Sequence, residues 1–302
     1  MAAAGRGGAD EGEDLLGEVF ERGGQRQGVG HTQSPACARV LAPDVPLALL
    51  QRIEDSSLNA SAPPQQRWLD GWIVRYNPGK AKRARCINAV ALGVRSAQDK
   101  LADCEALFRE AGLPLVVRIT PFTQPAALDS QLAAQGWSLF DDTRVMVLPQ
   151  LAQPPAVTPC LPAGWAETVE DAQAFAHTVG ALRGSSSVEI EAHAQRVAHS
   201  PVPYTGVVWR DGAGQVQVCG QIARESDLVG LYDIFTAPAA RGRGLATAFC
   251  AGLLAWAGQA GARTAYLQVD AANAPARQVY FKLGFQDGYT YHYRSHIEAG
   301  AH

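Results

Sequence analysis

Apolar residues follow two different spacings in the C-terminal half of the chain. Residues 229–236 are mostly apolar and β-prone, which is typical of a buried strand, and this run ends at Pro238. A compact β-prone run also covers 264–269. Between these runs the apolar residues recur at helical spacing, which predicts a helix with one buried face, at Leu245, Phe249, Leu253 and Trp256. The pattern therefore predicts strand, loop, helix and strand within the size of a βαβ unit.

A short helix and a last strand are expected after this unit. Asn273 is a favourable N-cap, Pro275 fits a first helical turn, and Gly284 is placed to end the helix before Phe285. The last strand is predicted at 289–293.

The N-terminal half shows the same order of elements. Ser96 is a suitable N-cap for a helix at 97–111, and the elements expected after it are a strand at 113–119, a helix at 125–134 and a strand at 143–148. The spacing Leu132-x-x-x-Gly136-Trp137 also matches Tyr280-x-x-x-Gly284-Phe285. We infer two copies of one fold. The first copy differs at 91–98, because this stretch lacks the paired glycines that precede the helix of the second copy.

The composition of the connecting segments suggests where the copies begin and end. Residues 1–40 are rich in Gly, Ala, Arg and Glu, and prolines accumulate at 149–162. We therefore predict a flexible leader at 1–40, a first domain at 41–155 and a second domain at 156–302.

The first domain also carries a cluster of basic residues. Residues 68–76 and 86–92 are predicted to pair as a hairpin with a turn at 77–79, followed by Lys80, Lys82, Arg83 and Arg85. Such a cluster fits either a site for an anion or acidic partner, or a solvated basic hairpin edge that discourages strand pairing. We favour the solvated edge.

The loop between the strand and helix of the second copy has the features of an anion site. Glycines allow backbone N–H groups to turn toward one point, and a helix N-terminus adds the positive end of its dipole. Two arginines add side-chain charge. The loop consists of Arg241, Gly242, Arg243, Gly244, Leu245 and Ala246, and it is suited to a diphosphate.

These residues resemble the GNAT superfamily of N-acetyltransferases. Its pyrophosphate loop, Arg/Gln-x-x-Gly-x-Gly/Ala, is matched by Arg241, Gly244 and Ala246. Its later signature, Asn-x-x-Ala-x-x-x-Tyr-x-Lys-x-Gly-Phe, is matched at every spacing by Asn273, Ala276, Tyr280, Lys282, Gly284 and Phe285. The two patterns in this order form a specific match. The chain is similar to tandem GNAT proteins with one degenerate half.

The resemblance implies a fold, a cofactor and a cofactor site. The expected fold is α/β (α+β), with two tandem GNAT-like domains, each a mixed and mainly antiparallel sheet flanked by helices. The expected co-substrate is acetyl-CoA, held by the 241–246 loop, by the strand edge at Ile234, Phe235 and Thr236, and by Asn273. Without the glycine loop, the first copy is expected to bind no CoA.

Acetyl transfer to an amine needs a polarised thioester carbonyl, a neutral amine and a proton for the leaving thiolate. The resemblance places Tyr280 as the general acid and a backbone N–H of the 234–236 strand edge at the carbonyl. Asp233 is the candidate base or, alternatively, an anchor for a cationic acceptor, and Glu225 is the second candidate base. Strand alternation predicts that Asp233 shares a face with Leu231 and Phe235.

The composition and charge of the chain argue against several classes of binding partner. The net charge of −3 and pI near 6.2 argue against a nucleic-acid partner, and no apolar run approaches membrane-spanning length. The six cysteines have neither paired nor His-linked spacing suited to zinc, so no metal is expected. We expect a cytoplasmic monomer or homodimer.

The sequence leaves two functions open. The first is an acetyl-CoA-dependent N-acetyltransferase that acts on a small-molecule amine, and the second is a non-catalytic acyl-CoA sensor or scaffold. Intact Tyr280 and Asp233 favour the enzyme.

Overall fold

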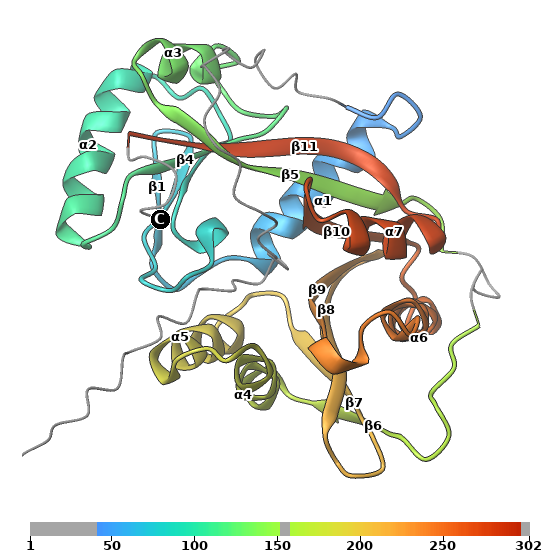
Figure 1. Cartoon of the computed structure of the whole chain (residues 1–302). Helices are drawn as coiled ribbons and strands as arrows, with labels where there is room; N and C mark the ends of the chain where they lie inside the picture. The colour runs from blue at the N-terminus through green and yellow to red at the C-terminus, as the bar shows by residue number, and fades with distance from the viewer. Residues whose placement is uncertain (1–40, 152–157, 297–302) are drawn as a thin grey trace, which may run out of the picture.

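Strands from both halves of the chain form one sheet in the computed structural model, which describes residues 41–151 and 158–296 (Figure 1). The predicted leader and the centre of the predicted linker lie outside the described residues. The sheet has eleven strands in the order β1-β2-β3-β4-β11-β5-β10-β9-β8-β7-β6. Most neighbours are antiparallel, and the parallel pairs are β3 with β4 and β9 with β10. This confirms the predicted mixed, mainly antiparallel fold flanked by helices.

The repeat predicted from the sequence is present in the order of elements. In the first half this order is β3 (Ile87–Ala89), α2 (Ala97–Glu110), β4 (Val116–Ile119), α3 (Leu128–Ala134) and β5 (Ser138–Leu148). In the second half it is β9 (Leu228–Thr236), α6 (Leu245–Gln259), β10 (Thr264–Asp270), α7 (Ala274–Lys282) and β11 (Gln286–Ser295). Each half thus contains a parallel strand pair joined by a helix.

The last strands of the two halves are exchanged. β5 of the first half lies between β10 and β11 of the second, with Met146 opposite Leu267 on one side and opposite Asp287 on the other. β11 in turn pairs with β4 of the first half, with Tyr293 opposite Arg118. Figure 1 shows β5 and β11 running side by side through the middle of the molecule. The halves therefore share one continuous sheet.

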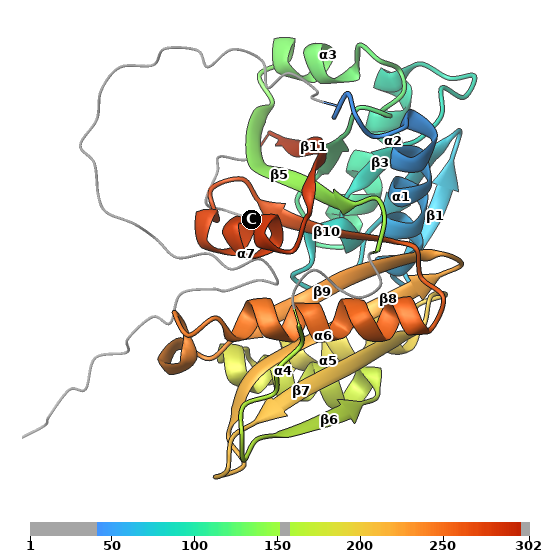
Figure 2. The same ribbon diagram turned by 90° about the vertical axis from the view of Figure 1, so that its right-hand side faces the viewer.

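The second half begins with elements that complete its side of the sheet. These are β6 (Ala166–Glu170), α4 (Ala172–Arg183), α5 (Ser187–Ala198), β7 (Tyr204–Arg210) and β8 (Val216–Glu225). α6 buries Phe249, Leu253 and Leu254 against one face of this sheet, whereas α4 packs Phe175 and Val179 on residues of the opposite face. Figure 2 shows α6 across β8 and β9, with α4 and α5 behind them.

The first half begins differently from its prediction. α1 (Leu47–Ala60) is followed by β1 (Gln66–Leu69) and β2 (Trp72–Arg75), which are joined at Asp70 and Gly71 with φ of 43° and 85°. The single strand predicted at 68–76 was therefore wrong, because Gly71 allows the chain to reverse inside it. β2 then pairs with β3, and the long connection between them carries the basic residues and a 3₁₀ turn, Lys82–Ala84.

Candidate active site

The parallel strands β9 and β10 separate halfway along their length. They pair from Leu228 opposite Thr264 as far as Leu231 opposite Leu267, and the register goes no further. The remaining residues of β9, up to Thr236, pair only with β8. Backbone groups of β9 beyond Leu231 are therefore available toward the gap, as the sequence analysis expected for this strand edge.

The predicted alternation of side chains along β9 was wrong at Asp233. This residue has φ of 51°, and the register with β8 shifts between Tyr232 opposite Gln221 and Phe235 opposite Cys219. The extra residue is a β-bulge, which turns the side chains that follow it. Leu231 and Ile234 consequently pack with the α6 cluster. Asp233 faces α4 and α5, as Phe235 does on the α4 cluster.

One cavity brings together several of the predicted site residues. Asp233, Ile234, Asn273 and Tyr280 all line it. Further lining comes from α4, α5 and the basic connection of the first half, including residues 77–83. Phe235, Thr236 and the 241–246 loop do not line this cavity. The acid candidate and the carboxylate candidate therefore face one space, and both halves of the chain enclose it.

The 241–246 loop lies exposed at the start of α6. Gly242 and Gly244 both have φ of 75°, and Gly244 is the N-cap residue of the helix. A Cβ at either glycine would meet nothing within 4 Å, so the space beside the loop is open. The side chain of Arg241 donates to the Thr236 carbonyl at 3.3 Å. Since the first N–H groups of a helix lack acceptors within the helix, this geometry fits a diphosphate such as that of CoA.

The matching loop of the first half holds a carboxylate from the chain itself. Asp70 accepts hydrogen bonds from the backbone N–H groups of Val94 and Arg95 at 2.8–3.0 Å. Those bonds lower the pKa of Asp70. A Cβ at Gly93 would lie 2.1 Å from the Asp70 carbonyl oxygen, so the two loops are in close contact. This arrangement favours the expectation that the first copy binds no CoA.

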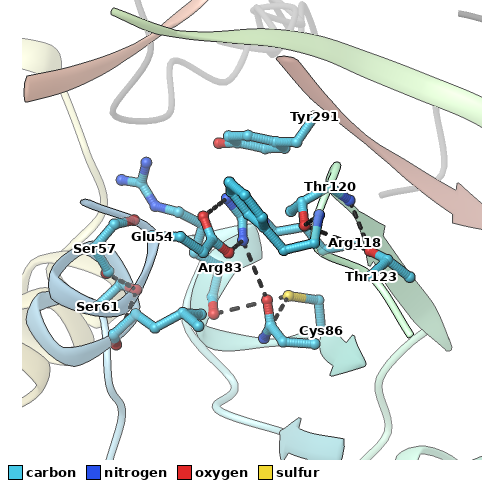
Figure 3. A network of polar contacts seen from close by, with 12 residues as sticks. Glu54, Ser57, Ser61, Arg83, Cys86, Arg118, Thr120, Thr123 and Tyr291 are labelled. Carbon is cyan, nitrogen blue, oxygen red and sulfur yellow. Dashed lines mark hydrogen bonds and ion pairs between the residues drawn. The ribbon is translucent and has the colours of Figure 1, made fainter. Parts of the chain in front are cut away.

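In the first half, a buried ion pair lies beside β4. Arg118 on β4 pairs with Glu54 of α1, and Tyr289 donates to the same carboxylate at 2.6 Å. The guanidinium carbon lies 4.0 Å from the centre of the Tyr291 ring. Figure 3 shows Glu54 and Arg118 side by side beneath this ring. The first half therefore has a buried ion pair beside β4, the strand that corresponds to β10 of the second half.

Tyr280 is a buried residue of α7. Its ring packs edge-on against Phe285, with 5.9 Å between the ring centres. Burial raises the pKa of its hydroxyl, and the nearby Cys250 thiol raises it further. The hydroxyl therefore keeps its proton at neutral pH. Asn273 accepts from the Ala276 N–H at 3.1 Å and so caps α7, as predicted.

Asp233 is held as a carboxylate by its neighbours. Arg183 of α4 donates to it at 3.0 Å, and Gln221 of β8 donates to it at 2.6 Å. Burial alone would raise the pKa of Asp233, but the charge of Arg183 and the contact with His193 hold it well below its usual range. A carboxylate so stabilised is a weak base. The geometry therefore suits an orienting group better than a proton acceptor.

His193 is a site residue that the sequence analysis missed. It lies on α5, its Nε2 is 3.4 Å from the Asp233 carboxylate, and it lines the same cavity as Tyr280. Its Nε2 is buried without a hydrogen-bond partner. No motif surrounds it in the sequence, so local patterns gave no signal for it.

The basic connection of the first half lines this cavity, and the interpretation of it as a solvated edge was wrong. Lys80 forms an ion pair with Glu189 of α5 at 2.5 Å, and Lys82 forms one with Asp141. The side chain of Lys82 is only 17% exposed. The loop folds over the second half because those carboxylates draw its lysines inward.

Glu225, the second candidate base, and two other polar side chains have structural contacts. Glu225 accepts from Asn59 at 2.8 Å, His292 contacts Asp129 at 3.0 Å, and Trp209 lies in the α6 core. None of these three residues lines the cavity.

Residues 41–151 and 158–296 contain neither a metal-binding cluster nor a membrane-spanning helix. No group of three or more His, Cys, Asp or Glu side chains is arranged to hold a metal ion in this part of the chain. No helix there has the length and apolar character needed to cross a membrane.

Solved structures show the same fold. A GCN5-related N-acetyltransferase from Kribbella flavida is 16% identical with a TM-score of 0.57, over 83% of this chain and 96% of that one. A conserved protein of unknown function from Staphylococcus epidermidis is 10% identical with a TM-score of 0.54, over 78% of this chain and 95% of that one. A tandem GNAT protein from the clavulanic acid biosynthesis pathway is 14% identical with a TM-score of 0.53, over 67% and 70%. These identities show the fold alone.

Sequence comparison identifies the family. No curated protein matches the chain. A family model described as the C-terminal region of the probable histone acetyltransferase Rv0428c matches residues 48–294. Because this match covers most of the chain, and because the fold is that of GNAT proteins, the chain belongs to the Rv0428c C-terminal family of GNAT acetyltransferases.

Proposed function

We propose that the chain is an acetyl-CoA-dependent N-acetyltransferase that acts on a primary amine of a small molecule. The observation that carries the proposal is the separation of β9 from β10 beside a cavity lined by Tyr280 and Asp233. The glycine loop at the start of α6 would hold the CoA diphosphate, and Asn273 lies near the path between them. Acetyl-CoA supplies the activated acetyl group when it is bound.

A backbone N–H and three side chains at the cavity have proposed roles in the direct transfer of the acetyl group to the amine. A backbone N–H of β9 beyond Leu231 polarises the thioester carbonyl, because it points into the gap that β10 leaves. The protonated Tyr280 hydroxyl gives its proton to the departing thiolate. His193 takes the proton of the attacking amine, directly or through a water molecule, while the Asp233 carboxylate, 3.4 Å from its Nε2, stabilises the positive charge that forms.

The cofactor loop is tested by replacing Gly244 with Ala. Both this residue and Gly214, in the β7–β8 turn, have positive φ, and a Cβ on either meets open space. Each substitution should therefore lower the free energy of unfolding by about 1–2 kcal/mol. Only Gly244→Ala should weaken CoA binding, by roughly tenfold or more, because it distorts the N–H groups at the start of α6. Calorimetric titration of CoA measures this difference.

The outcomes of that titration separate the hypotheses. Tight CoA binding by the natural chain, lost selectively in Gly244→Ala, supports the site. Absence of CoA binding by the natural chain contradicts it. Tight CoA binding without thiol release from acetyl-CoA, in the presence of any amine from a broad panel, would instead favour the sensor hypothesis.

The proposed base is tested by replacing His193 with Gln. We expect kcat to fall about 10²-fold, because an amide cannot take up the amine proton. His199→Gln is the matched control, since His199 is an exposed residue at the end of the same helix. A kcat for His193→Gln within a few-fold of that of the natural chain would show that another group receives the proton.

A further inference from the structure

We propose that the first half binds a small organic cation with apolar groups, such as an alkylammonium ion, in a second cavity beside α1. This cavity has a volume of about 520 Å³, and small-molecule sites typically have volumes of about 300–1,000 Å³. No described residue lines both this cavity and the candidate active site. The proposal therefore concerns a separate site and does not depend on acetyl transfer.

The cavity lies between α1 and one end of the parallel pair β3–β4. Its wall on α1 is a single face of the helix, because the lining residues recur at helical spacing, at Leu47, Gln51, Glu54, Asp55 and Leu58. The opposite wall consists of residues 88–90, Arg118 and the loop 120–124. Asn88 opposite Arg118 is the last registered pair of β3 with β4. The cavity thus opens where this parallel pairing ends.

Contacts within the first half and with β11 hold the loop wall of this cavity in place. The Gln124 N–H donates to the Ala89 carbonyl at 2.7 Å, and the Phe122 N–H donates to the Thr120 hydroxyl at 3.1 Å. The Phe122 ring packs edge-on against Tyr289, with 5.3 Å between the ring centres. The cavity is therefore preformed, and a ligand does not need to order this loop when it binds.

The lining of the cavity carries an excess of negative charge. Among the described residues, its charged side chains are those of Glu54, Asp55 and Arg118. Glu54 neutralises Arg118 through the buried ion pair that Figure 3 shows. The side chain of Asp55 forms no hydrogen bond or ion pair with any residue that the structure describes. One negative charge is therefore left without a partner.

The surroundings of Asp55 favour a cation beside it. Burial and the carboxylates of Glu54 and Glu225 raise the pKa of Asp55, so the described charged groups that act on it are both negative. An ammonium group next to Asp55 would offset the repulsion among these carboxylates. Asp55 is exposed, so it lies at the mouth of the cavity, where a ligand enters.

The rest of the lining favours an organic cation over a metal ion. Apolar side chains contribute much of the wall, and they are Leu41, Leu47, Leu58, Ala89, Val90, Pro121 and Phe122. Leu41 and Leu47 are 39% and 53% exposed, so part of this apolar surface contacts water. The methyl groups of an alkylammonium ion would cover such surface, and its charge would also be attracted to an aromatic ring, whereas a hydrated metal ion would gain neither contact.

The test compares a cation with an uncharged molecule of the same shape. Choline and 3,3-dimethyl-1-butanol differ in whether nitrogen or carbon carries the three methyl groups, and choline has no nitrogen lone pair with which to accept an acetyl group. Each is titrated into the full chain without CoA at constant ionic strength, and backbone amide shifts are followed by NMR. We expect choline to bind at least about fivefold more tightly, with the largest shifts at 88–90 and 120–124. Equal affinities, or shifts confined to other regions, overturn the proposal.

The variant Asp55→Asn removes the charge and keeps the shape of the side chain. We expect the Kd for choline to rise about fivefold or more, with the Kd for the neutral alcohol little changed. Asp44→Asn is the matched control, because Asp44 is an exposed aspartate shortly before α1 that does not line the cavity. A Kd for choline that is the same in Asp55→Asn as in the natural chain contradicts the proposed site.

Substitution of Gln51 tests the site by a gain of binding. Gln51 is exposed, lies one turn before Asp55 on α1 and lines the cavity. A second carboxylate in Gln51→Glu should tighten choline binding about threefold or more, and Gln51→Lys should weaken it by a similar factor. The same Kd in both variants would show that charge at this mouth does not govern binding, which overturns the proposal. Thermal unfolding checks that each variant is folded.

Discussion

Replacing Tyr280 with Phe should lower kcat for thiol release about 10²–10⁴-fold. The substitution removes one hydroxyl and keeps the ring that packs against Phe285, so the α7 core stays filled. Without the phenolic proton the thiolate must leave as an anion in a buried site. The affinity for CoA should change little, because the diphosphate loop at the start of α6 is untouched.

Tyr289→Phe is the control for the Tyr280 experiment. Tyr289 is also a fully buried tyrosine, but its hydroxyl donates to Glu54 and it does not line the cavity. The control should lose stability and keep kcat. A kcat for Tyr280→Phe within a few-fold of the natural chain, with folding and CoA binding preserved, would remove Tyr280 from the chemical step.

The raised pKa of Tyr280 adds a prediction on pH dependence to this experiment. Burial holds the pKa of the hydroxyl above its usual value, so the proton stays in place throughout the neutral and mildly alkaline range. The natural enzyme should therefore show no loss of kcat from ionisation of this group up to about pH 9. A stopped assay over this pH range measures kcat as a function of pH.

Replacing Glu54 with Gln should lower the free energy of unfolding by about 3–5 kcal/mol. The side chain of Arg118 is 1% exposed, and the substitution leaves its charge buried without a carboxylate. Combining Arg118→Met with Glu54→Leu should recover most of the loss, because an apolar pair of similar volume carries no desolvation cost. Urea unfolding of the single and double variants measures both effects.

The stabilisation from this pair should depend on pH with a definite sign. Burial alone would raise the pKa of Glu54, but the charge and hydrogen bonds of Arg118 outweigh burial and lower the pKa from its usual 4.5. A lowered pKa in the folded state gives stability that is complete above the unfolded pKa and is lost as pH falls through the folded value. The difference between the natural chain and Glu54→Gln should therefore shrink below about pH 4.5. A difference that grows with acid would contradict this account.

Local patterns in the sequence were sufficient to predict the repeat and the conformation of the glycine loop before α6. Helical spacing, caps and glycines depend on neighbouring residues, so α6, α7 and the positive φ of Gly242 and Gly244 could be predicted from them. The prediction that Asp233 shares a face with Leu231 was wrong, although Asp233 does lie on the same side as Phe235. Simple alternation assumes a regular strand, and the bulge with φ of 51° at this residue breaks it.

Contacts between distant segments could not be predicted in the same way. The basic connection after β2 has no local signal that places it beside α5, because its position depends on Glu189 and Asp141. The role of His193 likewise could not be predicted locally, because it depends on α5 bringing this residue close to Asp233. The exchange of β5 and β11 depends on which strand edge each one joins, and residues next to each other in the sequence carry no signal for that choice.

Because their last strands are exchanged, the two halves should not fold when they are produced as separate fragments. A cut near residue 155 would leave the second piece without the strand that separates β10 from β11, and the first piece without the strand between β4 and β5. Each fragment would then expose unpaired backbone edges in the middle of its sheet. The two fragments should be insoluble when produced alone and should regain a native assembly when produced together, so a minimal catalytic unit cannot be obtained by truncation at the linker.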